Sequence, residues 1–446
     1  MTETDSPVSV PAERNWVHLF RQSSPYINAH RGKTMVLALS GEAFEHDNFV
    51  NILHDIALLN SLGVRLVLVY GARPQIDRCL AQANITSGFH YNLRITQEEA
   101  MPYVLQAVGG LRGFLEARLS TGIVNSPMYG AGIRVVGGNV VLARPVGVLG
   151  GVDLCYTGKV RRVDTDMLQG LLAGGSIVLV SSVGYSLTGE AFNLSYEDVA
   201  ASVAVALKAE KLVMFSDQLG VVSTEDGLIR EVSVVQSDQL LAQDVLADEC
   251  RNLLSLAASA CKQGVIRSHI ISYVRDGALL EELFTRDGIG TLVTDDNYEQ
   301  IRSACIEDIG GILELLHPLE ELGILVRRSR ELLETEIENF TVDERDGSII
   351  GCAALYVYAE EKVGELACFA VTQSYRRSGR GDMLLTAIEK KAKARGMRQL
   401  FVLTTQTEHW FRERGFEPAS TDDLPQGKKI TYNQQRKSKV FVKKLS

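Results

Sequence analysis

The chain has 446 residues, about three times the length of a typical domain, so its length predicts at least two domains. Apolar residues make up 46% and charged residues 23% of the sequence, a balance that excludes intrinsic disorder and fibrous repeats as descriptions of the whole chain. The formal net charge of −9 excludes nucleic acid as a partner bound by phosphate neutralisation alone.

The cysteines and the start of the sequence predict where the protein works. Its 7 cysteines include no Cys-x-x-Cys pair, which argues against a disulfide framework or a zinc site, and we expect no bound metal. The first residues, Met1 to Asp5, are polar and acidic, unlike a signal or transit peptide. No stretch approaches the ~18 apolar residues that a membrane span needs. We therefore expect a cytoplasmic protein with free thiols and no membrane partner.

Residues 1–32 are expected to form a disordered tail and a short helix over 13–22, ahead of a first domain at 33–295. In this domain, apolar runs that end at glycine turns alternate with amphipathic segments. Continuous apolar strands alternating with helices are typical of a mostly parallel sheet with helices on both faces, so we predict an α/β fold. Residues 133–163 are expected to form an antiparallel hairpin region. The expected strands are 34–39, 64–70, 177–182 and 211–216, and the expected helices are 48–62 and 197–208.

The pattern changes near residue 295, and residues 296–446 are predicted to form a second, α+β domain. Antiparallel strand candidates surround one long helix, with shorter helices before and after it. A proline after His317 predicts that the first of these helices ends there. The expected strands begin at Ile301 and cover 337–343, 349–358, 364–372, 399–404 and 439–444, and the expected helices cover 307–316, 329–336, 380–395 and 407–414.

The most informative motif of the second domain is an apolar strand that leads into a basic, glycine-bearing turn. Glycines let backbone N–H groups approach an anion closely, and a helix N-terminus adds partial positive charge. The turn lacks the Gly-Lys-Ser/Thr of a Walker motif and the Gly-x-Gly-x-x-Gly of a dinucleotide site. It therefore favours a pyrophosphate, although a basic helix cap facing solvent has the same composition. The strand is Gly364–Val371 and the turn is Arg376-Arg377-Ser378-Gly379-Arg380-Gly381.

This segment resembles the acetyl-CoA-binding motif of the GNAT N-acetyltransferase superfamily. The resemblance implies that acetyl-CoA is a co-substrate, that no other cofactor is needed, and that an amine attacks the thioester directly. It implies that the main chain at Val371 contacts the pantetheine arm. The remaining implied contacts hold the pyrophosphate and come from Arg376, Gly379, Arg380 and Gly381.

Direct attack needs a base for the ammonium of the acceptor and an acid for the departing thiolate. Glu365 lies on the strand before the turn, where the superfamily often keeps its base, and burial in that apolar strand disfavours its charged form. The alternative is a strand-end glutamate that faces water. Many relatives use a tyrosine as the acid, but Phe411 has no proton to give, so Thr404 is the candidate and His409 a weaker one. Thr404 could equally cap the following helix.

Two basic runs offer arginines for a dicarboxylic acceptor, because a guanidinium binds a carboxylate with two parallel hydrogen bonds. Arg327 lies in one run and Arg436 in the other. Arg328 could take the place of Arg327, because adjacent side chains point in different directions. Either run could instead be a solvated patch that keeps the protein soluble.

Four segments resemble the bacterial, arginine-regulated N-acetylglutamate synthase family: Leu325–Arg330, Glu361–Val371, Val402–Phe416 and Tyr432–Val440. The resemblance covers nearly the whole chain and implies acetyl transfer to the amino group of L-glutamate, the first step of arginine biosynthesis. It implies that Arg327 and Arg436 bind the glutamate carboxylates and that Cys368 lies beside the substrate and the pantetheine. We interpret Cys368 as a small apolar residue rather than as a nucleophile.

Residues 33–295 resemble the amino acid kinase fold, acetylglutamate kinase in particular, and depart from it where phosphoryl transfer takes place. The kinases follow their first strand with Lys-x-Gly-Gly, whereas this chain has Ala38-Leu39-Ser40-Gly41. Their next turn, Gly-Gly-Gly-Pro, is here Gly71-Ala72-Arg73-Pro74. An alanine cannot supply the charge that stabilises a transferring phosphoryl group, so we predict no kinase activity.

Other features match the arginine-sensitive kinases, and the resemblance implies a regulatory site for L-arginine. Tyr26 follows the first predicted helix, and His269 is followed by Glu282 and by a turn that contains Gly288 and Gly290. Glu282 could pair with a cationic group of arginine while the glycine turn admits its carboxylate. A satisfied histidine at a strand end and a glutamate on a helix surface are the alternatives. The resemblance also implies a homo-oligomer, namely a hexamer interlaced by the N-terminal helix.

Two other functions fit parts of the pattern. The chain could be a non-catalytic arginine sensor with a decayed transferase domain, but the intact turn and the retained Glu365, Arg327 and Arg436 argue against this. It could also be a GNAT acetyltransferase for another amine. The two arginine runs favour a small dicarboxylic acceptor instead.

Overall fold

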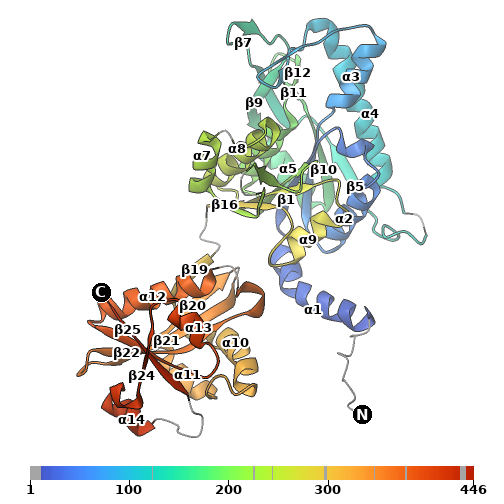
Figure 1. Ribbon diagram of the computed structural model, residues 1–446. Helices are drawn as coiled ribbons and strands as arrows, with labels where there is room; N and C mark the ends of the chain where they lie inside the picture. The colour runs from blue at the N-terminus through green and yellow to red at the C-terminus, as the bar shows by residue number, and fades with distance from the viewer. Residues whose placement is uncertain are drawn as a thin grey trace, which may run out of the picture. The chain divides into compact units, whose positions relative to one another are not determined.

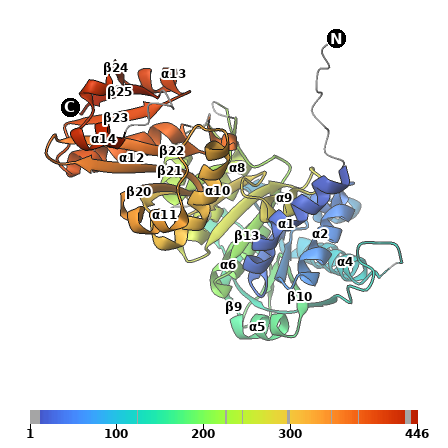
Figure 2. The same ribbon diagram turned by 90° about the horizontal axis from the view of Figure 1, so that it is seen from below.

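The computed structural model describes residues 12–122, 124–224, 227–243, 245–295, 299–345, 347–376, 379–431 and 438–445. The chain divides into two units, Met1–Asp296 and Asn297–Ser446, which Figures 1 and 2 show from two directions. Over these described ranges, no helix is both long enough and apolar enough to cross a membrane.

An eight-stranded sheet forms the centre of the first unit and confirms the predicted, mostly parallel α/β fold. Its strand order is β16-β18-β17-β13-β1-β2-β10-β5, and β17 with β18 is its one antiparallel pair. The strands are β1 (Thr34–Leu39), β2 (Arg65–Tyr70), β5 (Arg134–Gly137), β10 (Ser176–Ser181), β13 (Lys211–Ser216), β16 (Glu231–Ser233), β17 (Arg267–Ser272) and β18 (Thr291–Thr294).

Alternating side chains of β1 explain why helices cover both faces of this sheet. Val36 and Ala38 pack with α5, α6 and α8, while Met35, Leu37 and Leu39 pack with α2 and α4. Because successive strand side chains point to opposite faces, a strand that is apolar at every position needs cover on both. Figure 1 shows α2 and α4 on the side of the sheet away from α8. These helices are α2 (Phe49–Ser61), α4 (Met101–Leu119), α5 (Thr165–Ala173), α6 (Tyr196–Leu207) and α8 (Asp248–Lys262).

Smaller elements surround the central sheet. A second sheet of order β12-β11-β6-β9 contains the antiparallel pair β6 (Val141–Pro145) and β9 (Gly158–Val163), within the predicted hairpin region. β5 lies in the same region but joins the central sheet in parallel with β10. The other elements are β3 (Phe89–His90), β4 (Leu93–Arg94), β7 (Val148–Leu149), β8 (Val152–Asp153), β11 (Val183–Tyr185), β12 (Ala191–Asn193), β14 (Val221–Ser223), β15 (Gly227–Ile229), α3 (Arg73–Gln82), α7 (Val234–Ala242) and α9 (Ala278–Phe284).

Two helices extend beyond their predicted ends and continue through a proline. α1 (Ala12–His30) contains Pro25 and extends beyond the predicted range of 13–22, and α10 (Ile309–Glu321) contains Pro318. A proline removes one hydrogen bond from a helix interior, so tertiary contacts must offset the loss. The last turn of α1 has such a contact, because the His30 ring nitrogen Nε2 lies 2.7 Å from the Leu283 carbonyl oxygen. In α10, Leu319 follows the proline and packs against a buried cluster.

The second unit is built on a seven-stranded sheet and confirms the predicted α+β fold. Its order is β19-β20-β21-β22-β23-β25-β24, and β22 with β23 is its one parallel pair. α12 packs on one face, and α10 and α11 pack on the other. The elements are β19 (Glu299–Ser303), α11 (Arg330–Glu336), β20 (Phe340–Arg345), β21 (Ser348–Tyr358), β22 (Val363–Val371), α12 (Arg380–Ala394), β23 (Gln399–Thr404), α13 (Glu408–Arg412), β24 (Glu417–Ala419), α14 (Gln426–Thr431) and β25 (Lys439–Lys444).

Candidate functional site

The two central strands of the second unit are paired along only part of their length. The parallel ladder between β22 and β23 ends at Leu366 with Val402, although the strands continue to Val371 and Thr404. On its other side, β22 has an irregular register against β21, and within this irregularity Cys368 adopts a left-handed backbone with φ of 48°. Beyond Leu366, the β23-facing edge of β22 has no strand partner among the described strands. Such an edge can receive the main-chain groups of an extended ligand.

Glu365 lies on β22 just before this open edge, and its carboxylate is buried. The residue is 5% exposed and stands opposite Tyr356 of β21. Lys428 of α14 lies 2.6 Å from Oε1, and the Tyr358 hydroxyl donates to Oε2 at 3.2 Å. The predicted burial is therefore present, but the apolar surroundings expected from the strand sequence are not the whole environment. A cation and a hydroxyl group from two other elements hold this carboxylate.

One of the two adjacent arginines points toward Cys368. Burial raises the pKa of the Cys368 thiol to about 12 against the opposing effect of Arg328, so the thiol stays protonated near neutral pH. Arg328 is half-buried: desolvation works against its charge, but Cys368 and Tyr356 raise its pKa overall. Arg327 is exposed. Arg436 lies outside the described residues.

The two acid candidates differ in exposure. Thr404 is 8% exposed, and its Oγ1 lies 2.8 Å from the Thr407 hydroxyl oxygen and accepts from the Thr407 backbone N–H at 3.1 Å. These contacts are those of a hydroxyl that orders the turn before α13. His409 lies on α13 and is exposed, whereas Phe411 is buried.

The basic turn joins β22 to the N-terminus of α12. Val371 is 9% exposed, and its carbonyl oxygen accepts a hydrogen bond from Arg376 Nε at 3.2 Å. Gly379 precedes the helix with a φ of 76°, a conformation that favours glycine. A Cβ on Gly381 would lie 2.8 Å from Cζ2 of Trp410, so this glycine permits close packing of the indole. Arg380 is buried at 8% exposure, and residues 377 and 378 lie outside the described ranges.

Trp410 and Arg414 brace this turn and were missed by sequence reasoning. The Arg414 guanidinium lies 3.9 Å from the centre of the Trp410 ring. It also pairs with Asp382 of the first turn of α12, at 2.5 Å between Nε and Oδ1. The aromatic residue next to Phe411 was the available signal, but nothing in its spacing predicts a contact with Gly381.

In the first unit, His269 and Glu282 form one buried cluster with Lys211. Glu282 Oε1 lies 2.6 Å from His269 Nδ1, and Lys211 Nζ lies 3.2 Å from His269 Nε2. An ammonium can only donate, so Nε2 accepts and Nδ1–H donates to Glu282. Burial and the nearby Lys211 lower the pKa of His269 to about 4, which keeps the ring neutral.

The turn after α9 closes on the carboxylate of Glu282. Oε2 accepts from the N–H groups of Ile289 at 2.6 Å and Gly290 at 2.8 Å. Burial acts to raise the pKa of Glu282, but the hydrogen bonds from His269 and the two amides outweigh it and lower the pKa to about 2. A Cβ on Gly288 would lie 2.5 Å from Oε2, so the predicted glycines fit the carboxylate of this chain closely. Tyr26 lies on α1, with its ring centre 6.5 Å from that of His30.

The carboxyl ends of the first unit's strands carry acidic groups where the kinases bind phosphates. Tyr196 is half-buried, and a Cβ on Gly71 would meet its ring at 2.6 Å. Burial, together with Asp217 and Glu42, raises the pKa of Glu249, which places these three carboxylates near one another. An acidic, filled edge of this kind repels phosphates.

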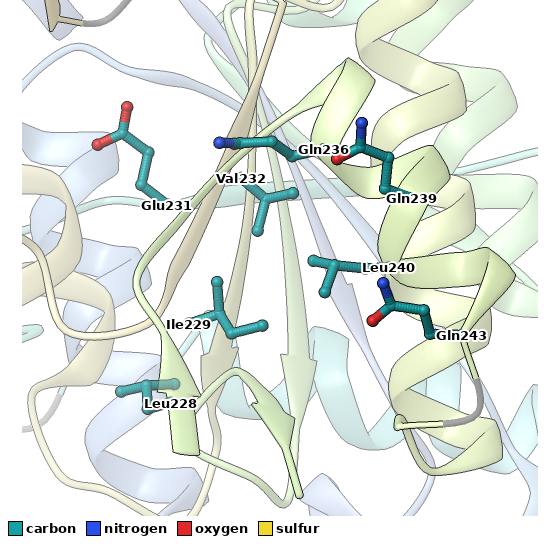
Figure 3. Close-up of a pocket in the computed structure, with 8 residues that line it drawn as sticks. All are labelled: Leu228, Ile229, Glu231, Val232, Gln236, Gln239, Leu240 and Gln243. Atoms are coloured by element: carbon teal, nitrogen blue, oxygen red, sulfur yellow. The ribbon is translucent and has the colours of Figure 1, made fainter. Parts of the chain in front are cut away.

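A cavity of about 340 Å³ lies between β15, β16 and α7, and none of the residues discussed above lines it. Figure 3 shows the side chains of Gln239 and Leu240 of α7, and of Gln243 just after it, facing Ile229 and Val232. Its lining is aliphatic with amide groups and a single carboxylate, so it lacks the groups needed for acid–base transfer. Over the described parts of the chain, no group of histidine, cysteine and acidic side chains could hold a metal ion.

Comparison with known proteins identifies both units. The amino acid kinase family matches residues 33–272, and the acetyltransferase (GNAT) family matches residues 311–416. The amino-acid acetyltransferase of Azotobacter vinelandii is 55% identical over 97% of this chain and 100% of its own length. The amino-acid acetyltransferase of Pseudomonas fluorescens is 55% identical over 98% of this chain and 100% of its own length.

Solved structures agree with this assignment. N-acetylglutamate synthase from Neisseria gonorrhoeae, complexed with coenzyme A and L-arginine, is 40% identical with a TM-score of 0.87, covering 96% of this chain and 99% of that one. The same enzyme complexed with coenzyme A and N-acetyl-glutamate is 40% identical with a TM-score of 0.61, covering 97% and 99%. Fold and site thus define a GNAT acetyltransferase unit joined to a unit of the amino acid kinase fold. The chain belongs to the amino-acid acetyltransferase family.

Proposed function

We propose that this protein transfers the acetyl group of acetyl-CoA to the amino group of L-glutamate, giving N-acetyl-L-glutamate, and that L-arginine regulates it. The observation that carries the proposal is the buried carboxylate of Glu365 beside the open edge of β22. It belongs to a chain that resembles N-acetylglutamate synthase over nearly its whole length. The gonococcal complexes with coenzyme A and N-acetyl-glutamate support the choice of substrates.

The proposed reaction is direct attack of the glutamate amine on the thioester carbonyl. Glu365 removes the proton of the ammonium, directly or through a water molecule, and the amine then attacks the carbonyl carbon. Backbone N–H groups of β22 beyond Leu366 polarise the carbonyl oxygen, and the C–S bond breaks. Thr404 is the proposed acid for the thiolate, although its hydroxyl also orders the turn before α13.

Acetyl-CoA is proposed to bind along β22 and the turn that follows. Val371 contacts the pantetheine arm through its main chain, and the N–H groups at the start of α12 face the pyrophosphate. Arg376, Gly379, Arg380 and Gly381 make up the turn, as its sequence predicts. A helix of 15 residues supports this role, because its N-terminus favours an anion.

The glutamate carboxylates are proposed to bind arginines near Cys368. Arg328 has the stronger support of the adjacent pair, because it faces Cys368 while Arg327 is exposed. Arg436 is the proposed second clamp on the basis of resemblance. Two inward cations would select a small dicarboxylic acceptor over a protein lysine.

The first unit is proposed to be regulatory and without kinase activity. Ala38 replaces the cationic residue of the kinases, and Tyr196 fills space over Gly71. L-arginine is proposed to bind near Tyr26, His269, Glu282, Gly288 and Gly290. Because Glu282 already accepts hydrogen bonds from its own domain, arginine binding there requires these contacts to rearrange. By family resemblance, we further propose a cytoplasmic hexamer.

Glutamate-dependent release of CoA, measured with and without L-arginine, tests this function. We expect release with glutamate and a changed rate at millimolar arginine. No glutamate-dependent release would favour a sensor with a decayed transferase domain, and activity with other amines alone would favour a different GNAT acceptor. An unchanged arginine response in Glu282→Ala would remove the proposed effector site, and phosphorylation of N-acetylglutamate from ATP would refute the absence of kinase activity.

A further inference from the structure

The ion pair between Lys428 and Glu365 joins two parts of the second unit that are far apart in the sequence. Glu365 belongs to the central strand β22, and Lys428 belongs to α14, a short helix between β24 and β25 in the chain. The two charged groups lie 2.6 Å apart, with the lysine side chain 22% exposed and the glutamate side chain 7% exposed. Among the described residues, no other cation forms an ion pair with that carboxylate.

Stability alone is a poor explanation for this pair. Removing a carboxylate and an ammonium from water costs about as much as their attraction returns, so a buried ion pair often adds nothing over apolar packing. The surrounding side chains would accommodate an apolar alternative, since Phe401, Leu424 and Val440 form a buried cluster on this part of the sheet. Stability therefore does not account for the pair, and its contact with the buried Glu365 carboxylate suggests a role at the site.

We propose that Lys428 is a positioning residue for the transfer reaction: its ammonium pairs with the Glu365 carboxylate and orients it for the substrate proton. This inference rests on the proposed function, in which Glu365 is the base. The proton passes from the substrate ammonium to Glu365, and Lys428 keeps its own protons throughout.

The geometry leaves the carboxylate able to act. An ionised carboxylate has about four lone-pair positions on its two oxygens. Lys428 contacts Oε1 and Tyr358 donates to Oε2, so each oxygen has one described contact and one further position. The two contacts fix the plane of the carboxylate in the way that catalysis requires of a base.

The remaining groups near Glu365 do not replace the lysine charge. Burial beside Glu365 raises the pKa of Tyr358, and Tyr356 stands opposite Glu365 on β21 with a pKa that is also raised, so both phenols stay neutral. Cys368 on the same strand stays protonated. Phe401 faces Glu365 from β23 and has no charge. Glu361 acts on Tyr358 with a further negative charge, and Arg328 is placed at Cys368 rather than at Glu365.

Loss of the ammonium should therefore change the pH dependence of the reaction in one direction. A buried carboxylate without a counter-ion holds its proton to higher pH, because burial disfavours the charged form. The acid limb of the kcat/KM profile reports the ionisation of the base in the free enzyme. In Lys428→Met this limb should move to higher pH by about one unit, which lowers activity about tenfold on the acid side and leaves it near wild type on the alkaline side.

The decisive experiment measures pH profiles of glutamate-dependent CoA release for matched variants of the full chain. Lys429→Met removes an exposed lysine from the same helix and should leave the profile unchanged. Lys428→Arg keeps the charge and should restore most of the wild-type profile. In a Glu365→Gln background, Lys428→Met should cause no further loss, because Lys428 acts through Glu365.

The possible outcomes separate this role from its competitors. A wild-type profile in Lys428→Met overturns the proposal and leaves Lys428 as an anchor for α14. A further loss in the Glu365→Gln background, with a raised KM for glutamate, overturns it in favour of direct contact with a substrate carboxylate. Thermal unfolding shows whether Lys428→Met folds. If it does not, Lys428→Gln replaces it as the variant without the charge, and Lys428→Arg remains the variant that keeps the charge. Wild-type enzyme without glutamate-dependent release rejects the proposed function itself, whereas active wild type with an unshifted variant rejects only the role of Lys428.

Discussion

Among the described residues, each unit of the molecule holds one buried glutamate, and comparing the two separates a carboxylate held by its own turn from one beside an open strand edge. Glu282 receives a hydrogen bond from His269 and two from backbone N–H groups, and its side chain is 3% exposed. Glu365 is contacted by Lys428 and Tyr358, and its side chain is 7% exposed. Burial alone does not distinguish the two residues, but their hydrogen-bonding partners do. The backbone N–H groups at Glu282 fix a turn over its carboxylate, whereas the two side chains at Glu365 leave space for a substrate.

The difference also follows from position. Glu282 lies on a short helix, and the turn of residues 288–290 closes over its carboxylate. Glu365 lies one position before the end of the parallel ladder with β23, which stops at Leu366, although β22 itself continues to Val371. A carboxylate at such an edge can meet an incoming ligand directly, while one beneath a turn must first give up contacts with its own chain. Substitutions at the two sites should therefore have opposite effects on turnover and on stability.

The largest expected effect is on turnover in Glu365→Gln. The amide keeps the size of the side chain but cannot accept the proton, so kcat should fall by about 100-fold or more. Steady-state rates of CoA release at saturating acetyl-CoA and glutamate measure this. The matched variant Glu282→Gln should keep kcat within about twofold of wild type in the absence of arginine. Equal losses in the two variants would contradict the distinction between them.

The second effect is on stability in Glu282→Gln. The glutamine amide would face the N–H donors of His269, Ile289 and Gly290 with an NH₂ group or with a weaker acceptor oxygen. Breaking such a buried charged contact costs about 3 kcal/mol of folding free energy. Hydrogen exchange of the peptide that contains Ile289 and Gly290 should become faster by about 100-fold. Glu281→Gln is the control, because Glu281 pairs with Arg275 at the surface and such pairs contribute about 0–1 kcal/mol. Unchanged exchange in Glu282→Gln would show that the turn does not depend on the carboxylate.

Elements whose pattern is local could be predicted from the sequence almost to the residue. The predicted strands at 211–216, 399–404 and 439–444 are β13, β23 and β25, because each has consecutive apolar residues between polar ends. The ends of α1 and α10 could not be predicted. Pro25 and Pro318 carry a local signal to stop, and contacts with residues distant in sequence outweigh it.

The residues of the candidate site likewise fall into those with a local sequence pattern and those without one. Glu365 could be found because it lies in the motif-bearing strand, but Lys428 is 63 positions away in a polar segment without a pattern. The sequence left Arg327 and Arg328 as alternatives, because the direction of a loop side chain depends on the backbone. Trp410 packs against Gly381 although the two residues are far apart in the sequence. Contacts between distant segments are set by tertiary packing, which no local pattern records.

A third prediction concerns the other substrate of the transferase unit. In Gly381→Ala, the new Cβ would lie 2.8 Å from the Trp410 ring and displace the start of α12. We expect the KM for acetyl-CoA to rise about tenfold, within the ~1–3 kcal/mol typical of overpacking, with a smaller change in the KM for glutamate. Trp410→Phe in the same chain should restore part of the loss. Gly310→Ala is the control, because nothing lies within 4 Å of a Cβ at that position. A KM equal to wild type would place the pyrophosphate away from this turn.

The smallest expected effect is a pH dependence that belongs to the first unit alone. The folded pKa of His269 is lowered from 6.5 to about 4, so between these values the unfolded chain takes up a proton that the folded chain does not. This contribution to stability is present above about pH 6.5 and is lost as the pH falls toward 4. His269→Gln does not titrate, and its amide can still donate to Glu282 and accept from Lys211. Its stability should therefore fall less with decreasing pH, by about 1 kcal/mol at pH 5.5.

Urea unfolding of the first unit at a series of pH values measures this difference. His317→Gln is the control, because that histidine is 58% exposed at the surface of the second unit. An equal pH dependence in His269→Gln and wild type would mean that His269 is charged in the folded state. The cluster would then contain an ion pair between His269 and Glu282 rather than a neutral ring between Lys211 and Glu282. Both buried glutamates would then be paired directly with a cation, Glu282 with His269 and Glu365 with Lys428.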